Sequence, residues 1–334
     1  MPGIGVISNA NARLNKMAPW LKNRLNFILG RRGELINTYT LEDVDKALQD
    51  FINLEVDIIA ISGGDGTAHR TIEKLLKAFS PEKLPPLLLL PSGTQNMVPK
   101  SLGITGNSIT TMLQVQTMYT HNIPIKTIRR NLLKVNEHYS FMFGLGVPPR
   151  YLQRHYARGT SHWNAVTLLA DYAWDGIKKG DKARELFKPV PMKYSVNGSE
   201  PIFNETIHTI FCSFAEELAL RWRCFPRAGW QKDNFETLFV DSNFLQTFPI
   251  LGHLWAGSMK ELKGLERHMT TSVRLELETP EPCTLDGDLY EPELVFDIKP
   301  GPELRFVVPS ITNFDRNINA RSEKTGPWGR VFYV

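Results

Sequence analysis

Short apolar runs alternate with amphipathic stretches over the N-terminal third of the chain. Continuous apolar runs, which are typical of strands buried on both faces of a parallel sheet, occupy residues 4–7, 56–62 and 86–90. Apolar side chains recur at helical spacing in residues 19–29, 41–54 and 68–79. With a further strand at 33–40, the alternation predicts an α/β domain with a mainly parallel sheet over residues 1–125.

The pattern changes near Pro124. Short alternating segments follow at 132–135, 139–143, 207–214, 237–240, 273–277, 294–298 and 304–308. Because Gly, Pro, Asn and Asp turns separate them, we expect a second domain, an antiparallel β-sandwich, over residues 126–310. Helical spacing interrupts this domain at 162–177 and 244–263, and the polar tail 311–334 has no assigned role.

Composition narrows the class of protein. The chain has 334 residues, and 39 Lys and Arg against 35 Asp and Glu give a net charge of +4. This excess of positive charge is too small to indicate nucleic-acid binding, although it is compatible with docking on an anionic surface.

The three cysteines form no CxxC pair, which indicates a reducing compartment. No apolar run approaches the roughly 18–20 residues that span a bilayer, and the N-terminus lacks the order of a signal peptide. We therefore expect a cytoplasmic protein.

The segment IIAISGGDGTAHR is the most informative one for chemistry. A buried strand leads through a glycine turn directly into a helix, and such a turn lets backbone N–H groups approach a phosphate at the positive end of the helix. Asp65 adds a carboxylate that can hold Mg²⁺ near phosphates, and Thr67 adds a hydroxyl. A bare GGDG would equally fit a tight turn with an acidic cap, but the strand–turn–helix context favours phosphate binding.

A second turn, PSGTQN, follows the next buried strand. Because the carboxyl ends of parallel strands share one edge of a sheet, we expect residues 63–67 and 91–96 to converge at the edge where ligands bind in open α/β sheets. The sequence therefore predicts a nucleotide-phosphate site at this edge.

The two turns and their spacing resemble the catalytic domain of the diacylglycerol kinase family, which includes bacterial lipid kinases, sphingosine kinases and ceramide kinases. The resemblance rests on GGDGT, the later PxGTxN and a Leu-Gly pair, and it extends more weakly to Thr40, FMFGLG at 141–146 and DGD at 286–288. The motifs follow one another in the same order as in the family, and the resemblance covers roughly residues 4–309.

The resemblance implies a role for particular residues. ATP phosphates and adenosine would be lined by Thr40, Gly63, Gly64, Asp65, Gly66, Thr67, Thr94 and Asn96. Asp65 would join the Mg²⁺–phosphate network, and Asp288, at the position of the family's Glu, would accept the proton of a lipid hydroxyl. Asp233 matches an acid that holds a structural metal in some members.

Several positions depart from the family pattern. The family's opening motif is reduced to residues 8–12, His69-Arg70 replaces an Asn-Glu pair, and Asn234 replaces a Gly. These departures keep open the alternative of a non-catalytic nucleotide-binding regulatory protein. A second alternative is a soluble-acceptor kinase related to NAD kinase, because NAD kinases share the GGDGT turn. The Thr-Pro-Thr-Gly-Ser-type loop of NAD kinases is absent, as are a P-loop, GxGxxG, HExxH and GxSxG.

Basic residues in the predicted second domain bear on a membrane role. Arg150, Arg154 and Arg158 recur every four residues, so that one helical face could hold lipid phosphates or could simply be a solvated basic face. A second basic-aromatic patch comprises Arg221, Arg223, Arg227, Trp222 and Trp230. The expected protein is an ATP- and Mg²⁺-dependent kinase whose partner is a lipid substrate at the membrane surface, without nucleic acid; neither the lipid nor the oligomeric state follows from the sequence.

Overall fold

The computed structural model describes residues 3–93, 96–104, 106–159, 162–178, 180–216, 222–229, 231–242, 244–309 and 332–333. The chain divides into two compact units. Unit 1 comprises Met1–Asn131, Trp230–Lys232 and Pro302–Val334, and unit 2 comprises Leu132–Gly229 and Asp233–Gly301.

A parallel sheet forms the centre of unit 1. Its strands, in spatial order, are β4 (Leu87–Pro91), β3 (Ile58–Gly63), β1 (Ile4–Asn9) and β2 (Gly33–Thr38). Every neighbouring pair in this order is parallel. The three strands predicted from the apolar runs and the further strand predicted at 33–40 are therefore confirmed, together with their parallel arrangement.

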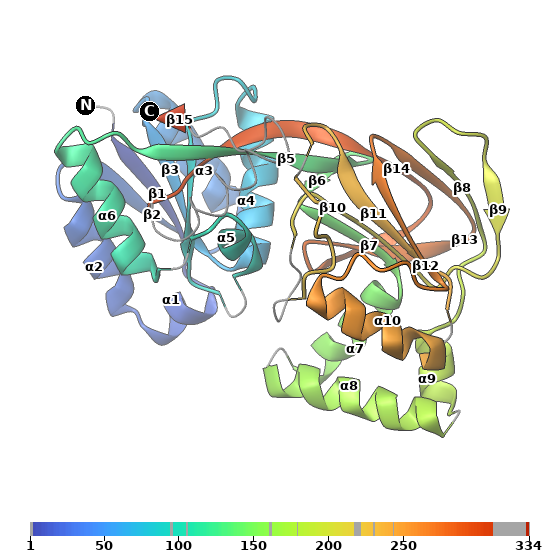
Figure 1. Ribbon diagram of the computed structural model, residues 1–334. Helices are drawn as coiled ribbons and strands as arrows, with labels where there is room; N and C mark the ends of the chain where they lie inside the picture. Colours follow the sequence, from blue (N-terminus) through green and yellow to red (C-terminus); the bar gives the residue numbers. More distant parts are fainter. Residues whose placement is uncertain are drawn as a thin grey trace. The chain divides into compact units, whose positions relative to one another are not determined.

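Helices cover both faces of this sheet. On one face, α2 (Trp20–Leu29) and α6 (Ser108–Thr120) lie side by side and share an apolar core with β1, β3 and β4 (Figure 1). On the other face lie α3 (Leu41–Asn53) and α4 (Asp65–Ala78), and the Phe51 ring of α3 packs directly over Gly5. Two short helices, α1 (Arg13–Met17) and α5 (Met97–Ser101), follow β1 and β4. The sheet edge after these strands is thus bordered by helix ends.

Antiparallel strands make up most of unit 2. The path runs β12 (Leu265–Thr270), β11 (Phe235–Val240), β10 (Thr209–Ser213), β7 (Met142–Gly146), β13 (Val273–Leu285) and β14 (Asp288–Val307). Next to these lie β8 (Met192–Val196), β9 (Ile202–Asn204), β6 (His138–Ser140) and the second half of β5 (Lys126–Val135). The helices are α7 (Val147–Arg158), α8 (His162–Ile177), α9 (Asp181–Leu186) and α10 (Phe244–Ala256). The predicted antiparallel character is confirmed.

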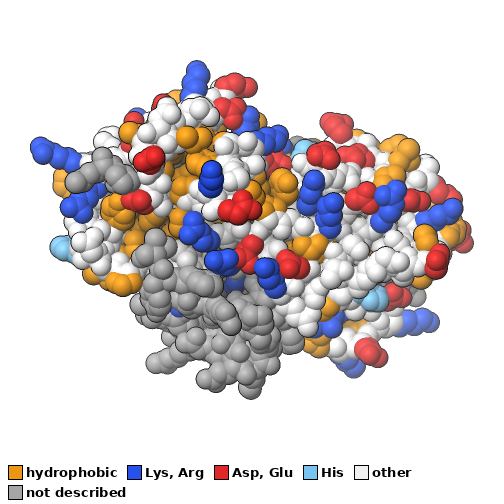
Figure 2. All heavy atoms as spheres, turned by 90° about the horizontal axis from the view of Figure 1, so that it is seen from above, with side chains coloured by type: hydrophobic (Ala, Val, Ile, Leu, Met, Phe, Trp, Pro, Cys, Tyr) orange, Lys and Arg blue, Asp and Glu red, His pale blue; other side chains and the backbone are white. Residues whose placement is uncertain are grey.

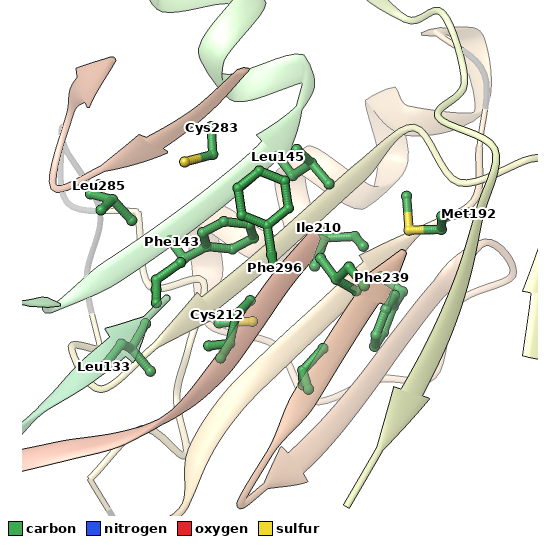
Figure 3. Packing of buried hydrophobic residues seen from close by; sticks show 14 of the residues in the cluster. Leu133, Phe143, Leu145, Met192, Ile210, Cys212, Phe239, Cys283, Leu285 and Phe296 are labelled. Carbon is green, nitrogen blue, oxygen red and sulfur yellow. The ribbon is translucent and has the colours of Figure 1, made fainter. Parts of the chain in front are cut away.

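The core of unit 2 is built from inward-facing side chains of these strands (Figure 3). Phe143 and Phe296 come from β7 and β14, and their rings pack with centroids 5.4 Å apart. Cys212 and Cys283 are buried in the same cluster as small apolar side chains, and burial raises the pKa of each thiol to about 12. These thiols are therefore uncharged at neutral pH and act as packing groups.

Several predicted boundaries are wrong, each for a local reason. The strands predicted at 294–298 and 304–308 are one strand, β14, which continues from unit 2 into unit 1, where Phe306 pairs with Leu87. The helix predicted from 244 to 263 ends at Ala256, because Gly257 adopts a φ of +67°. The helix predicted from residue 68 begins at Asp65, directly after the glycine turn.

The molecular surface reflects the nearly balanced charge of the chain. Acidic and basic side chains are interspersed over the face shown in Figure 2. No helix within the described part of the chain is long and apolar enough to cross a membrane. Of the tail, the described residues are β15 (Phe332–Tyr333), which pairs antiparallel with the start of β5.

A buried ion pair fixes the 222–229 segment of unit 2 to the sheet. The Glu236 side chain on β11 is fully buried, and its Oε1 lies 3.1 Å from Nη1 of Arg267 on β12. Its Oε2 accepts a hydrogen bond of 2.9 Å from the backbone N–H of Arg227. Arg227, which the sequence places in a basic patch, therefore contributes its charge to a buried carboxylate.

We expect Glu236→Ala to lower the free energy of unfolding by about 3–5 kcal/mol, because removing one partner leaves the buried Arg267 charge uncompensated. Glu266→Ala on β12 is the matched control, because Glu266 is exposed and its partner is His268. Urea unfolding of both variants tests this expectation. Equal stability of the two variants would contradict the structural role of Glu236.

Candidate functional site

The two glycine turns of unit 1 converge at one edge of the parallel sheet, as the sequence predicts. β3 and β4 are neighbours in register, with Gly63 opposite Pro91, and the Ser92 N–H donates a 2.9 Å hydrogen bond to the Gly63 carbonyl. A Cβ atom added to Gly93 would lie 2.4 Å from the Cα of Gly64. The backbones of the two turns are therefore in direct contact, and only glycine permits this approach.

The first turn leads straight into the N-terminus of α4. Gly64 is the N-cap residue in an extended conformation, and Asp65 occupies the first turn of the helix. A Cβ on Gly63 would lie 2.4 Å from the Thr67 Cβ, so this glycine is required for the turn to fold back against the helix. Backbone N–H groups and the helix dipole at such an N-terminus favour an anion, phosphate above all.

Asp65 links the first turn to the second. Its Oδ1 accepts a 3.0 Å hydrogen bond from the Val98 N–H in α5. Asn96, just before α5, has a left-handed backbone with φ +50°; its side chain accepts from the Gly93 N–H at 2.9 Å and donates to the Gly93 carbonyl at 3.1 Å. Asp65 and Asn96, both predicted to line the nucleotide, thus determine the shape of the second turn. Thr94 lies outside the described residues.

Two asparagines complete the edge and were missed as site residues. At the end of β1, Asn9 Nδ2 donates a 2.8 Å hydrogen bond to Thr67 Oγ1. Asn15 on α1 donates to the Asn9 carbonyl at 2.8 Å and to the Ser62 carbonyl at 3.3 Å. The only sequence signal for Asn9 was the polar stretch directly after the first apolar run, which lies in the segment 8–12 that departs from the family motif.

Buried hydroxyl groups lie beneath the turns. Ser62 and Ser92 are 3.1 Å apart at their Oγ atoms, and Ser92 and Ser108 are 2.9 Å apart. Ser108 in turn donates to the Pro91 carbonyl at 2.8 Å. All three side chains are buried, so this chain of hydrogen bonds ties the ends of β3 and β4 to the start of α6.

Thr40 follows β2 at the same edge, as the N-cap of α3. Its Oγ1 accepts a 3.2 Å hydrogen bond from the Asp43 N–H, and the Asp43 carboxylate accepts from the Thr40 N–H in a capping box. Hydrogen bonds from the backbone of Tyr39 and Thr40 lower the pKa of Asp43. The structure thus accounts for Thr40 as a helix cap, and its contact with a nucleotide stays a prediction.

The His69-Arg70 pair occupies the second turn of α4. The His69 side chain is buried, and its Nε2 lies 4.0 Å from Glu73 Oε2, while Arg70 lies 3.8 Å from the same carboxylate oxygen. The buried imidazole of His69 and the guanidinium of Arg70 thus stand where the family pattern has an Asn-Glu pair.

In unit 2, the DGD segment forms the two-residue turn between β13 and β14. Asp286 and Gly287 both have positive φ, at +52° and +92°, and Leu285 pairs with Asp288 across the hairpin. The buried Asp286 carboxylate accepts hydrogen bonds of 2.9–3.0 Å from the backbone N–H groups of Phe141 and Met142. The first acid of this segment therefore fixes the hairpin against the strand entering the unit.

Asp288, the second acid, is the half-buried first residue of β14. Next to it, the hydroxyl of Tyr156 on α7 donates to the Gly287 carbonyl. Burial, followed by the negative charge of Asp288, raises the pKa of Tyr156, so that the phenol stays protonated at neutral pH and keeps this hydrogen bond. The backbone of the turn that precedes Asp288 is thereby fixed by hydrogen bonds of Tyr156 and of Asp286.

The arginine stripe on α7 is present, and acidic side chains pair with all three members. Arg150 lies 2.9 Å from Glu281, Arg154 lies 2.5 Å from Glu185, and Arg158 lies 2.6 Å from Asp171. The stripe thus ties α7 to α8, α9 and β13, which weakens the prediction that it holds lipid phosphates. Of the second basic-aromatic patch, Arg221 and Trp230 lie outside the described residues, and Trp222 packs against an apolar cluster.

The two predicted metal ligands differ in their surroundings. Within the described ranges, no three or more His, Cys, Asp or Glu side chains are grouped as a metal cage. Mg²⁺ that arrives with a nucleotide needs only one or two protein carboxylates, because phosphate oxygens and water complete its shell. Asp65 at the phosphate-binding turn fits this requirement, whereas the exposed Asp233 stands in a turn with φ +60° and does not fit a metal held by protein alone.

We expect Gly93→Ala to destabilise unit 1 by about 1–3 kcal/mol, because the added methyl group would overlap the backbone of Gly64. The matched control is Gly252→Ala in α10, where a Cβ meets nothing within 4 Å and removal of a helical glycine is neutral or stabilising. Thermal unfolding of both variants tests this expectation. A Gly93→Ala protein as stable as the control would contradict the direct contact of the two turns.

Comparison with known proteins shows what the segment that carries these features is similar to. Residues 4–128 match the family model of the diacylglycerol kinase catalytic domain, which confirms the resemblance for the segment that carries both glycine turns. A diacylglycerol kinase from Bacillus anthracis str. Sterne superimposes with a TM-score of 0.65 at 16% identity, covering 91% of this chain and 96% of that one. A structure of a proposed diacylglycerol kinase from the same organism gives 0.66 at 16% identity, covering 90% and 96%. At this identity the structural likeness establishes the fold. No curated protein matches the sequence.

Proposed function

We propose that this protein is an ATP- and Mg²⁺-dependent lipid kinase that transfers the γ-phosphate to a hydroxyl of a diacylglycerol- or sphingoid-like lipid. The observation that carries the proposal is the contact of the two glycine turns at the N-terminus of α4, within the segment that matches the kinase catalytic domain. In this proposal residues 1–125 are the nucleotide-binding domain and residues 126–310 a β-sandwich that binds the lipid.

Backbone groups do most of the nucleotide binding in this proposal. N–H groups of residues 63–67 hold the ATP phosphates, because the turn forms the N-terminus of α4, where unpaired N–H groups and the helix dipole favour negative charge. Thr67, oriented by Asn9, presents its hydroxyl on the same side, and Thr40, Thr94 and Asn96 border the nucleotide. When bound with ATP, Mg²⁺ neutralises phosphate charge, and the carboxylate of Asp65 holds it.

Asp288 is the general base of the proposed reaction. Its carboxylate accepts the proton of the lipid hydroxyl as that oxygen forms a bond to the γ-phosphorus, and the bond from the γ-phosphorus to the β–γ bridging oxygen breaks to release ADP. Hydrogen bonds of Asp286 and Tyr156 fix the backbone of the hairpin that carries Asp288. Since phosphoryl transfer is accelerated mainly by positioning, the rigidity of the hairpin is part of the mechanism.

Two alternatives remain as proposals with distinct readouts. A kinase related to NAD kinase would phosphorylate a soluble acceptor, and liposome co-sedimentation with phosphotransfer to lipid distinguishes it from a lipid kinase. The substitution of the family's polar pair by the buried His69 and by Arg70 favours the other alternative, a nucleotide-binding protein without catalysis. Such a protein would bind ATP without transferring phosphate to any acceptor.

The test is transfer of radiolabelled γ-phosphate to extracted lipids, together with ATP binding by calorimetry. We expect Asp288→Ala to lower transfer about a hundredfold to ten-thousandfold while ATP binding is retained, because only the proton acceptor is lost. We expect Asp65→Asn to abolish transfer and to weaken Mg²⁺-dependent ATP binding.

Matched controls are available in each unit. Asp297→Asn changes an exposed carboxylate of β14 that pairs with Arg274, and Asp45→Asn changes one that pairs with Lys74. Both should retain wild-type transfer. Full activity of Asp288→Ala or Asp65→Asn would refute the assigned roles, and ATP binding by a wild-type protein that phosphorylates no lipid would refute the lipid-kinase proposal.

A further inference from the structure

Unit 1 exposes large apolar side chains on α1 and α2. Phe27 is 87% exposed, Met17 is 70% exposed and Trp20 is 57% exposed. Trp20 and Phe27 border a shallow surface hollow that Asn23 and Arg24 complete, and all four recur at the spacing of one helical face. We call Trp20, Asn23, Arg24 and Phe27 the α2 face.

The exposure of the α2 face does not arise from a loosely attached helix. The opposite side of α2 buries Leu21, Leu25 and Leu29 in the core that the sheet shares with α6. The helix is therefore fixed, and its outward aromatic side chains are held toward solvent. Isolated exposed apolar residues are common, but a grouped set of this size on a packed helix marks an interaction surface.

The charged residues of the segment that carries the α2 face are all basic. Residues 13–32 contain six basic residues and no acidic residue: Arg13, Lys16, Lys22, Arg24, Arg31 and Arg32. All six side chains are exposed. The neighbouring helix α6 carries no charged residue at all. In contrast to the arginines of α7, each paired with a carboxylate, this segment therefore presents its charge without an acid of its own.

Aromatic side chains surrounded by Lys and Arg are the combination that an anionic lipid surface takes up. Trp and Phe rings enter the boundary between headgroups and acyl chains, and basic side chains attract anionic lipid phosphates within a Debye length. A second copy of this chain fits less well, because a symmetric contact would bring six positive charges against six.

We propose that the α2 face docks unit 1 on an anionic lipid bilayer, with Trp20 and Phe27 entering the interface and the surrounding basic residues holding lipid phosphates. The purpose of this docking rests on the proposed function, in which the acceptor is a lipid. The α2 face is linked to the glycine turns through α1, because the Leu14 N–H donates a 3.1 Å hydrogen bond to the Ser92 carbonyl and Asn15 donates to the Ser62 carbonyl.

Co-sedimentation with vesicles of phosphatidylcholine, alone or with phosphatidylglycerol, tests the docking surface. We expect the wild-type protein to bind the anionic vesicles at least about tenfold more tightly than the neutral ones, and this preference should fall with added salt. The double variant Trp20→Ser, Phe27→Ser and the single variant Arg24→Glu should each lose about tenfold in binding to the anionic vesicles.

The matched control is Trp174→Ser with Phe203→Ser, which removes two exposed aromatic side chains from unit 2 and should bind as the wild type does. Far-ultraviolet circular dichroism verifies that each variant is folded. Wild-type binding without preference for anionic vesicles, or α2-face variants that bind as well as this control, would overturn the proposal. So would a loss of self-association, measured by sedimentation velocity, in α2-face variants that still bind vesicles.

Phosphotransfer to lipid dispersed in uncharged detergent micelles separates this proposal from the proposed function. If the α2-face variants lose vesicle binding and keep micellar transfer, the docking surface is supported apart from catalysis. If the wild type transfers no phosphate but binds anionic vesicles through the α2 face, the docking surface stands and the lipid-kinase proposal fails.

Discussion

The contact between the backbones of Gly64 and Gly93 is the constraint on which the candidate site depends. A Cβ added to Gly93 would lie 2.4 Å from the Gly64 Cα, so the second turn can take its shape only with glycine at this position. The hydrogen bonds of Asp65 to α5 and of Asn96 across its own loop hold the turns in that contact. The N-terminus of α4 is thereby left at the sheet edge, with its dipole toward any bound anion.

Carboxylates divide into supporting and reacting groups in this fold. Asp286 and Glu236 are buried, and each accepts backbone hydrogen bonds, so their charge stabilises particular turns and segments. Asp65 and Asp288 are only half-buried; Asp65 is the first residue of α4, and Asp288 is the first residue of β14. Proton transfer and metal binding require a carboxylate that a substrate can reach, which suits these two for the proposed chemistry.

The sequence was sufficient to predict the parallel strands of unit 1 and the convergence of both turns, because continuous apolar runs and glycine turns are local signals. The roles of Asn9 and Asn15 could not be predicted, because their partners Thr67 and Ser62 lie far away in the sequence. The ion pairs of the α7 arginines could not be predicted for the same reason, since Glu281 lies on β13 and Glu185 lies on α9. The four-residue spacing of these arginines correctly indicated a helix, but it could not indicate which acidic residues pair with them.

Hydrogen exchange of the intact protein, with and without ATP and Mg²⁺, tests the central claim most directly. If the two glycine turns bind the nucleotide phosphates, added ATP should slow the exchange of backbone amides in residues 62–70 and 92–98, where the turns and the first residues of α4 and α5 lie. ATP binding that leaves the exchange of both segments unchanged, or protects amides of unit 2 alone, would contradict the account.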